Sequence, residues 1–400
     1  MKNKNKSLSL VICALLSALL VGCAMVAGNS EEAIAAVEST VPDTIEATPV
    51  SIVETTPEPT PSPSPEPKNR SQTSGREIPE GTPSRPVIMS IENTDGAKPQ
   101  TGLMQADIIY EFMVESMITR LQVLYNDQYP IYAGPFRSAR YYFIDLAQEW
   151  DGMYLHLGYG PPGGKYHYSD SEIAEKVGVY PRDGEKAFYG YATAFNRKKG
   201  PYNDYEIKNG YRFRTKDRPS PHNLYVMVDK TAQKFYGEHL AAVHERFRFI
   251  ENAKYENGQK FTTVSLPYMN TDNPNWVQFV YDSSKNRLLR KESGADFMVR
   301  TPSADGEALT EEQMNVQNLI VQYVSYGKMP DDDKGRRTCE LVGSGKCDYF
   351  INGQHVTGTW SRPSLDDFTT YLLDDGSTVM LEPGNTWVAV HPNDVHITIQ

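Results

Sequence analysis

The sequence lacks the short motifs by which familiar enzyme classes are recognised. It contains no P-loop, no G-x-S-x-G nucleophile elbow and no G-x-G-x-x-G pattern set between a strand and a helix. An H-E-x-x-H zinc motif and the local Cys–His and Ser–His signatures are missing as well. These absences count against a familiar hydrolase, although a catalytic triad assembles in space and leaves no fixed order in the sequence.

Residues with metal-ligand chemistry occur in patterns that fit no metal site. The run Asp331-Asp332-Asp333 has no following glutamate where an EF-hand loop requires one, which favours a solvated charge run. His239 and His244 lie five residues apart, a poor spacing for one ion on a helix. We therefore predict neither a metal nor a cofactor.

Basic residues are outnumbered by acidic ones. The 400 residues include 40 Lys and Arg against 51 Asp and Glu, a formal net charge of −11. A general nucleic-acid binder requires a basic patch or a high isoelectric point, so the charge argues against nucleic acid as a partner. The length leaves room for two folded domains, and 25 tyrosines beside 39% hydrophobic residues predict a well-packed core with an aromatic-rich surface.

The N-terminus carries the features of an export signal. Lys2, Lys4 and Lys6 precede an apolar run of about 13 residues, within the range of ~7–15 for a signal peptide and short of the ~20 that span a bilayer. The run ends in Leu20-Val21-Gly22-Cys23, which resembles the lipobox of bacterial lipoproteins. That resemblance implies that residues 1–22 are removed and that Cys23, carrying lipid, anchors the chain to the cell membrane on its extracytoplasmic side. A plain secretory signal with a chance cysteine is the alternative.

The next segment has almost no residues that could build a core. From residue 24 to residue 84 there is no Phe, Tyr, Trp or Leu, and prolines alternate between Pro57 and Pro67. Such a segment buries too little apolar surface to offset its ordering entropy, so we predict a disordered, semi-rigid linker over 23–84. The linker would hold the folded part away from the bilayer.

Cysteine usage agrees with export. Cys13 lies in the signal and Cys23 would carry lipid, which leaves Cys339 and Cys347. These two flank Gly343-Ser344-Gly345, a turn signal, so a hairpin would bring them within bridging reach and predicts a disulfide. Free buried thiols are the alternative.

The folded part divides by pattern into two regions, and together they predict an α+β protein. Residues 85–250 are expected to form a mixed α/β-type domain, with strands over 86–91, 108–114 and 118–125 and a helix over 141–150 that Ser138 would cap. Residues 251–400 hold β-rich runs separated by Asn-Gly and Asp-Gly turns, which predict a mainly antiparallel β domain.

One candidate site surrounds the expected helix. Arg137 and Arg140 precede its N-terminus, where a carboxylate or phosphate would be favoured. Asp145 and Glu149 share one face of the helix, and His156 follows on the next strand. If these groups converge they suffice for acid–base chemistry. The alternative is that the arginines form structural ion pairs.

A second candidate site lies at His222 and Asn223, where the histidine would act as a general base or contact a ligand, or simply bond backbone groups. The stretch before it alternates cations with other residues. If that stretch is a strand, one face carries Arg212, Arg214, Lys216 and Arg218. Such a face would either bind anionic polymer or glycan or remain a solvated surface.

Several runs in the folded part are similar to one known family. The runs are Arg85–Asn93, Gly134–Arg140, Pro221–Leu224, Gly343–Gly345, Gly358–Trp360 and Pro383–Trp387. In composition and order they resemble the YerB-like bacterial lipoproteins, over about residues 85–392. The resemblance implies two tandem domains of unknown function that meet near residue 250, behind a lipoprotein signal. It supplies no catalytic residues.

Three functional classes fit these observations. The favoured one is a membrane-anchored binding module for wall glycan, an anionic polymer or an envelope protein. The second is a hydrolase or transferase that acts on cell-wall polymers with the Arg, His and carboxylate residues of the N-terminal domain. The third, a solute receptor of an importer, would show two α/β lobes, and the β-rich C-terminal half argues against it.

Overall fold

The computed structural model describes residues 69–156, 211–235, 247–269, 276–330 and 332–400. All of the described residues belong to one compact unit. The signal segment, Cys23 and the predicted linker up to residue 68 lie outside the described residues, as does the glycine-rich loop at 158–164. Residues 69–84 were also expected in the linker, but Ser71, Thr73 and Ser74 are buried against the folded part.

The fold is predominantly β, which corrects the expected α+β class and its mixed α/β-type N-terminal domain. The described residues hold 25 strands and two α-helices, α1 (Tyr141–Glu149) and α5 (Val228–Phe235). Helix α1 falls where it was predicted, but its N-cap position is Arg140 and not Ser138. The predicted class was wrong because one correctly predicted helix, α1, suggested that helices and strands alternate in this half. Most neighbouring strands instead pair antiparallel with one another.

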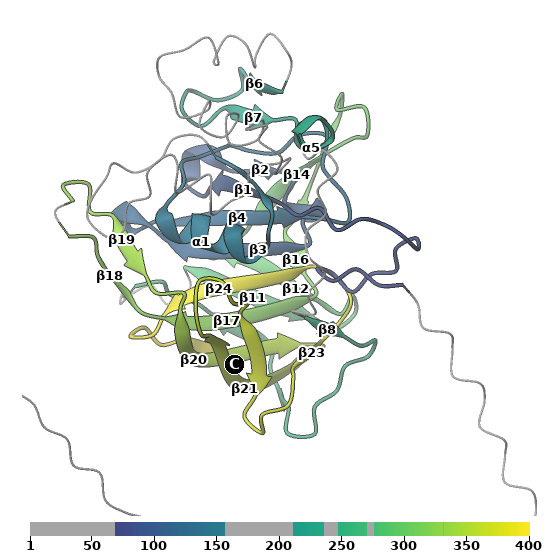
Figure 1. Ribbon diagram of the computed structural model, residues 1–400, viewed down its shortest axis with the longest axis vertical. Helices are drawn as coiled ribbons and strands as arrows, with labels where there is room; N and C mark the ends of the chain where they lie inside the picture. The colour runs from purple at the N-terminus through teal and green to yellow at the C-terminus, as the bar shows by residue number, and fades with distance from the viewer. Residues whose placement is uncertain (1–68, 157–210, 236–246, 270–275, 331) are drawn as a thin grey trace, which may run out of the picture. The chain divides into compact units, whose positions relative to one another are not determined.

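A sheet of ten strands forms the centre of this unit (Figure 1). Nine follow the order β22-β21-β20-β17-β24-β3-β4-β1-β5, and β9 also pairs with β21. Their bounds are β1 (Val87–Glu92), β3 (Ile108–Met113), β4 (Thr119–Tyr125), β5 (Met153–Leu155), β9 (Gln259–Lys260), β17 (Asn318–Val324), β20 (Gly343–Ile351), β21 (Gln354–Arg362), β22 (Thr370–Leu373) and β24 (Thr386–Pro392). Because β24 pairs in parallel with β3, one sheet contains strands from both halves of the sequence.

Smaller sheets surround the central one. A six-stranded sheet has the order β13-β12-β11-β10-β25, with β16 beside β12, and a three-stranded sheet has the order β15-β14-β2. The two-stranded sheets are β6 with β7, β8 with β23 and β18 with β19. The bounds are β2 (Gln100–Thr101), β6 (Arg212–Arg214), β7 (Leu224–Val226), β8 (Arg248–Phe249), β10 (Thr263–Ser265), β11 (Val277–Asp282), β12 (Arg287–Glu292), β13 (Ala295–Asp296), β14 (Met298–Pro302), β15 (Leu309–Gln313), β16 (Asn315–Val316), β18 (Tyr326–Lys328), β19 (Arg337–Cys339), β23 (Met380–Leu381) and β25 (Thr398–Ile399).

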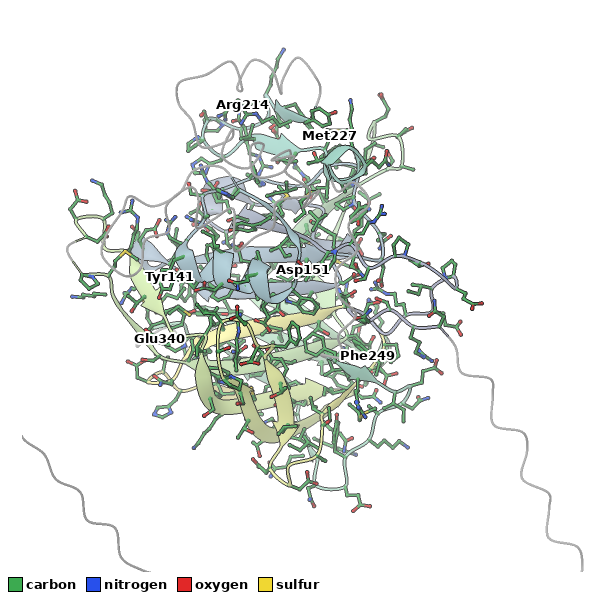
Figure 2. All side chains as sticks on the ribbon, viewed as in Figure 1. Tyr141, Asp151, Arg214, Met227, Phe249 and Glu340 are labelled. Atoms are coloured by element: carbon green, nitrogen blue, oxygen red, sulfur yellow. The ribbon has the colours of Figure 1, made fainter. Side chains whose placement is uncertain are left out.

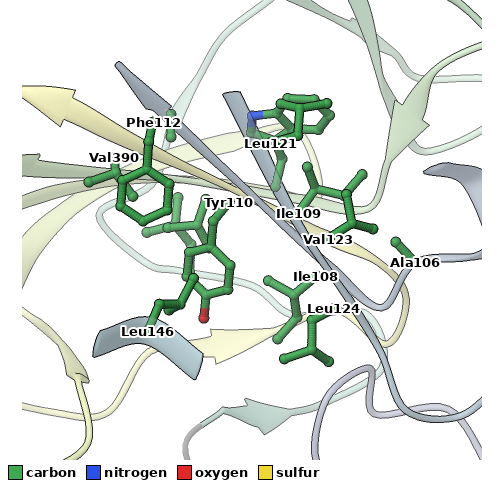
Figure 3. Packing of buried hydrophobic residues seen from close by; sticks show 14 of the residues in the cluster. Ala106, Ile108, Ile109, Tyr110, Phe112, Leu121, Val123, Leu124, Leu146 and Val390 are labelled. Atoms are coloured by element: carbon green, nitrogen blue, oxygen red, sulfur yellow. The ribbon is translucent and has the colours of Figure 1, made fainter. Parts of the chain in front are cut away.

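The strands predicted over 108–114 and 118–125 are confirmed as β3 and β4, which pair as an antiparallel hairpin and organise the core. Alternation along β3 sends Tyr110 and Phe112 to the face that α1 covers, where Leu146 of the helix packs (Figure 3). Ile109 points to the opposite face, toward Val123 of β4 (Figure 3). The central sheet is therefore buried on both faces near β3.

Two buried ion pairs connect the halves of the chain. On the sheet face opposite α1, the Glu111 carboxylate accepts a hydrogen bond from Arg290 at 3.1 Å, and neither side chain is exposed. The Arg290 guanidinium also stacks on the rings of Phe297 and Trp387. At the end of α1, Glu149 pairs with Arg362 of β21 at 3.1 Å.

The predicted disulfide is not formed in this structure. Cys339 and Cys347 are both buried free thiols, and burial raises their pKa values above that of an ordinary thiol. The prediction failed because the segment from Gly343 to Gly345 is not a turn. It is the first part of strand β20, so Cys339 ends β19 while Cys347 lies inside the central sheet.

Candidate functional site at the end of strand β1

Three side chains that are distant in the sequence meet where strand β1 ends. We call Glu92, Arg137 and His222 the polar centre. The Arg137 guanidinium lies 2.6 Å from Glu92 Oε2, and His222 Nδ1 lies 2.9 Å from Glu92 Oε1. His222 Nδ1 is also 3.1 Å from Arg137 Nη2. The structure therefore brings together one residue from each of the two predicted sites.

Backbone hydrogen bonds hold the polar centre in place. The loop after Gly134 is hydrogen-bonded to β1 and to β7. The Arg137 N–H donates to the Ser90 carbonyl of β1, and the Phe136 N–H donates to the Leu224 carbonyl of β7. His222 sits just before β7. Gly96, in the 3-10 turn η1 (Asp95–Ala97), lets the backbone approach the imidazole, since a Cβ there would lie 3.1 Å from His222 Cδ2.

The electrostatics of the polar centre keep Glu92 ionised. Its carboxylate is only 4% exposed, and burial opposes its charge. The hydrogen bonds from Arg137 and Thr94 and the Arg137 charge outweigh burial and lower the pKa of Glu92 below its ordinary value. The polar centre is thus a buried carboxylate whose charge the protein itself satisfies.

A second ion group lies beside the polar centre at the start of α1. Arg140 pairs with Glu115 in the 3-10 turn η3 (Glu115–Met117), and Arg120 lies 3.6 Å from the same carboxylate. Burial would raise the pKa of Glu115, but Arg140 and Arg120 lower it. Burial and the Arg140 charge lower the pKa of Arg120 to about 10. Arg137 and Arg140 therefore each have a carboxylate partner within the protein.

The remaining residues of the first predicted site lie elsewhere. Glu149 forms an ion pair with Arg362 and accepts a hydrogen bond from the Thr369 N–H at 2.8 Å, at the opposite end of α1 from Arg140. Asp145 is buried in the same helix. His156 is buried beyond β5, and its ring stacks on that of Tyr154. The predicted cluster is therefore divided among separate places.

The four predicted cations do not form one face. Strand β6 covers only Arg212–Arg214, and Arg212 is buried. Arg218 turns inward and donates to the Ala97 carbonyl at 2.5 Å. Arg214 lies in the upper part of the view in Figure 2 and donates to Asn223 Oδ1 at 2.7 Å. Lys216 is exposed.

The polar centre can do limited acid–base chemistry. A carboxylate that accepts from Nδ1–H orients an imidazole and leaves Nε2 free as a base. Arg137 only donates, so the same Nδ1 cannot both donate to Glu92 and accept from Arg137. Within the described parts of the chain no group of three or more His, Cys, Asp or Glu side chains is placed to hold a metal ion.

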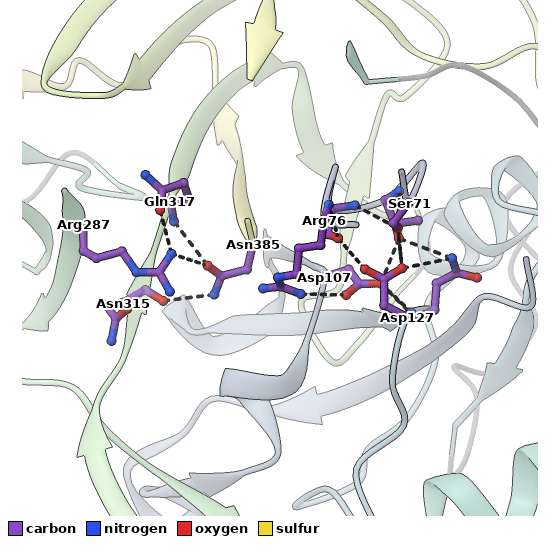
Figure 4. Close-up of polar contacts among 11 residues, drawn as sticks. Ser71, Arg76, Asp107, Asp127, Arg287, Asn315, Gln317 and Asn385 are labelled. Carbon is purple, nitrogen blue, oxygen red and sulfur yellow. Dashed lines mark hydrogen bonds and ion pairs between the residues drawn. The ribbon is translucent and has the colours of Figure 1, made fainter. Parts of the chain in front are cut away.

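A further polar cluster, which no sequence pattern indicated, fixes the segment from residue 69 (Figure 4). Thr73 Oγ1 donates to the buried Asp107 at 2.8 Å, and Ser71 Oγ donates to Asp127. Arg76 lies 3.4 Å from Asp107. Burial, followed by the nearby Asp127 charge, raises the pKa of Asp107 to about 7. Ser71, Thr73 and Ser74 were assigned to the linker because they directly follow a segment with the composition of a linker.

Glu92 and Glu115, the partners of the two arginines, were also missed. Glu92 did carry a signal, since a carboxylate that directly follows a buried strand lies close to the core. Glu115 carried none, because its role depends on the turn between β3 and β4.

Comparisons with known proteins agree with this architecture. The family described as "Protein of unknown function (DUF3048)" matches with its N-terminal domain over residues 73–241 and with its C-terminal domain over 264–388. "Putative lipoprotein YerB" of Bacillus subtilis is 26% identical over 315 residues, which cover 78% of this chain and 82% of that protein. The crystal structure of YerB protein from Bacillus subtilis has a TM-score of 0.60 at 24% identity and covers 83% of this chain and 99% of its own. The chain therefore belongs to the YerB-like family, and it carries both the N-terminal and the C-terminal DUF3048 domain.

Proposed function

We propose that this protein is a lipoprotein held on the extracytoplasmic face of the cell membrane. The support is the run Leu20-Val21-Gly22-Cys23 together with a relative whose name is that of a lipoprotein. In the described part of the chain, no helix has the length and apolar character to cross a membrane. Lipid on Cys23 would supply the anchor.

The folded part acts as a binding module of the cell envelope. The observation that carries this proposal is the division of the predicted reactive residues into separate internal ion pairs. Arg137 is paired with Glu92, Arg140 with Glu115 and Glu149 with Arg362. Groups that are paired with one another inside a fold are costly to separate and are therefore poorly placed to act on a substrate.

Among the possible ligands, a protein or a wall glycan has more support than an anionic polymer. A polyanion requires several free cations on one surface. Of the four cations in the predicted face, Arg212 is buried and Arg218 donates to main-chain carbonyls. Only Arg214 and Lys216 remain exposed there.

A hydrolase or transferase for wall polymers is the second candidate. It is supported by the Glu92–His222 hydrogen bond at 2.9 Å, because a carboxylate-oriented imidazole is the core of many acid–base sites. His222 is partly accessible, with a side-chain exposure of 26%.

A sedimentation experiment distinguishes these functions. The full-length chain in detergent is mixed with purified cell wall at low and at high salt, as wild type, as His222→Ala and as the double variant Arg214→Glu, Lys216→Glu. We expect wall binding that neither salt nor the substitutions change more than about twofold. Release of soluble wall fragments by the wild type and not by His222→Ala would replace the binding module with the enzyme. Loss of binding at high salt and in the double variant would identify an anionic polymer. No binding to this wall, nor to wall that retains its attached proteins, would overturn the proposal.

A further inference from the structure

A groove in the C-terminal half of the chain shares no residue with the polar centre. It is lined by residues 253–256, by Phe261 after β9, by Tyr281 in β11 and by the turn at 352–353 between β20 and β21. We call it the Tyr281 groove. Its volume of about 1030 Å³ is close to the upper end of the range of roughly 300–1,000 Å³ that is typical of ligand pockets.

The tyrosine ring of this groove is held at two points. Its hydroxyl donates to Asn286 Oδ1 at 2.9 Å. The ring itself lies against Gly353, where an added Cβ would be 2.6 Å from Tyr281 Cε1. Tyr281 is half-buried, so the protein fixes the ring without covering it. Because the ring is already ordered, a ligand that contacts it pays little of the entropy cost of immobilising a side chain.

Aromatic packing forms the floor of the Tyr281 groove. Phe261 is buried, and its ring centroid lies 5.8 Å from that of Tyr281 and 4.9 Å from that of Phe350 in the central sheet. The groove therefore has an apolar floor that is continuous with the core.

The wall opposite Tyr281 is fixed by side-chain amides. The Tyr255 N–H donates to Gln354 Oε1 at 3.0 Å, and Gln354 Nε2 donates to the Tyr255 carbonyl at 2.9 Å. The Met380 N–H donates to the Tyr255 hydroxyl at 3.1 Å. Asn352 Nδ2 donates to the Ala253 carbonyl at 3.0 Å. These bonds hold the groove in its open form.

Polar groups at the rim are left over from this network. Among the residues that the structure describes, Asn352 Oδ1 accepts no hydrogen bond and the exposed Ser283 hydroxyl has no partner. Lys254, Lys260 and Glu256 are exposed at the groove and form no ion pair with any described residue. Two cations beside one carboxylate leave the rim close to neutral.

A fixed aromatic ring beside neutral polar groups fits an uncharged sugar chain. The C–H groups on one face of a sugar ring carry a small positive charge and pack on the negatively polarised face of an aromatic ring. Sugar hydroxyl groups can donate to Asn352 Oδ1 and can exchange hydrogen bonds with Ser283. A polyanion would require clustered cations, and a basic peptide would require more carboxylates than Glu256.

We propose that the Tyr281 groove binds the uncharged sugar backbone of wall glycan, with one sugar ring stacked on Tyr281. The apolar floor supplies contact area, and Asn352 and Ser283 fix the orientation of the chain. This inference rests on the proposed binding function and names wall glycan as its ligand.

The test uses the full-length chain in detergent and three soluble probes. Chitotetraose, a chain of four N-acetylglucosamine units, represents the glycan. Poly(glycerol phosphate) represents an anionic polymer, and a hexapeptide of alternating valine and lysine represents a basic peptide. Saturation-transfer NMR titrations give the dissociation constant of each probe.

Three variants examine the groove, and one serves as control. Tyr281→Ala removes the ring and Tyr281→Phe keeps it. Ser283→Trp places a bulky side chain in the groove from an exposed position, where the fold should tolerate it. Tyr132→Ala is the matched control, because Tyr132 is a half-buried tyrosine that does not line the groove. Thermal melting of each variant reports on its fold.

We expect chitotetraose to bind about tenfold more tightly than either comparison probe. Tyr281→Ala and Ser283→Trp should each weaken its binding by about tenfold, while Tyr281→Phe and Tyr132→Ala should change it by less than about threefold. No binding of chitotetraose, equal or tighter binding of a comparison probe, or unchanged binding in the folded Ser283→Trp variant would overturn the proposal. If wall sedimentation succeeds while chitotetraose does not bind, the proposed binding function stands and only the assignment of this groove is wrong.

Discussion

The polar centre and the cluster around Asp107 hold their buried carboxylates in opposite ways. At the polar centre, charged side chains meet and neutralise one another around the buried Glu92. Around Asp107 the near neighbours are the Thr73 hydroxyl and a second carboxylate, Asp127, and Arg76 lies 3.4 Å away. The contrast teaches that the conspicuous charges of this sequence build the fold, and that the neighbours of each buried carboxylate decide whether its pKa is lowered or raised.

The largest expected effect tests whether buried charge is structural. Replacing Arg290 with leucine leaves Glu111 buried with no cation, so we expect the free energy of unfolding to fall by about 3–5 kcal/mol. Urea titration of the full-length chain measures it. Arg300→Leu is the matched control, because that side chain is 23% exposed and its ion pairs should contribute less than about 1 kcal/mol. Equal losses in the two variants would contradict the account.

A pH effect at Asp107 comes next. Its pKa is raised from 3.8 to about 7 in the folded protein, so its favourable contribution is complete below about pH 4 and is lost as the pH rises through about 7. Asp107→Asn does not titrate. Between pH 4 and pH 8 the wild type should lose up to about 4 kcal/mol of stability relative to this variant.

Urea titrations at several pH values follow the Asp107 effect, with Asp333→Asn at the exposed charge run as control. A constant difference between Asp107→Asn and the wild type across this range would show that Asp107 is not the buried acid described above.

Glu92 should behave in the opposite way. Because its pKa is lowered in the fold, its contribution is present above the unfolded value near 4.5 and disappears as the pH falls. Glu92→Gln should cost about 1–3 kcal/mol at pH 7 through the loss of charged hydrogen bonds, and the deficit should shrink below about pH 4. Chemical unfolding at both pH values measures the change, with the exposed Glu312→Gln as control. A deficit that grows in acid would contradict the assignment.

The smallest effect on stability is expected at the exposed Glu340. Among the described residues its carboxylate accepts no hydrogen bond, so Glu340→Lys should change the free energy of unfolding by less than about 0.5 kcal/mol. Thermal melting measures the change. A loss comparable with that in Glu92→Gln would mean that Glu340, like Glu92, contributes to the fold.

Sequence patterns predicted the local elements of this fold well. Alternating apolar residues identified the β3–β4 hairpin, helical spacing identified α1, and Asn352-Gly353 identified the turn between β20 and β21. Each of these signals is local. The sharing of one sheet by both halves of the chain was not predicted, because the pairing of β3 with β24 joins residues more than 270 positions apart and no local pattern encodes it.

The candidate sites were predicted less well for a related reason. Arg137 and His222 were both identified, but Glu92, which joins them, was not. The run Gly343-Ser344-Gly345 was noticed and interpreted as a turn, because glycine is typical of turns. Glycine is required at Gly345 because the Trp360 indole lies against it, and this contact arises only from the register of β20 with β21.

The pKa of the Glu92 carboxylate, measured by carbon-13 NMR in the wild type and in Arg137→Gln, tests the central claim most directly. In the wild type this pKa should lie below the ordinary value of 4.5, because the hydrogen bonds from Arg137 and Thr94 and the Arg137 charge outweigh burial. In Arg137→Gln it should rise, because burial is then opposed less strongly. A wild-type pKa above 4.5, or one that Arg137→Gln leaves unchanged, would contradict the account.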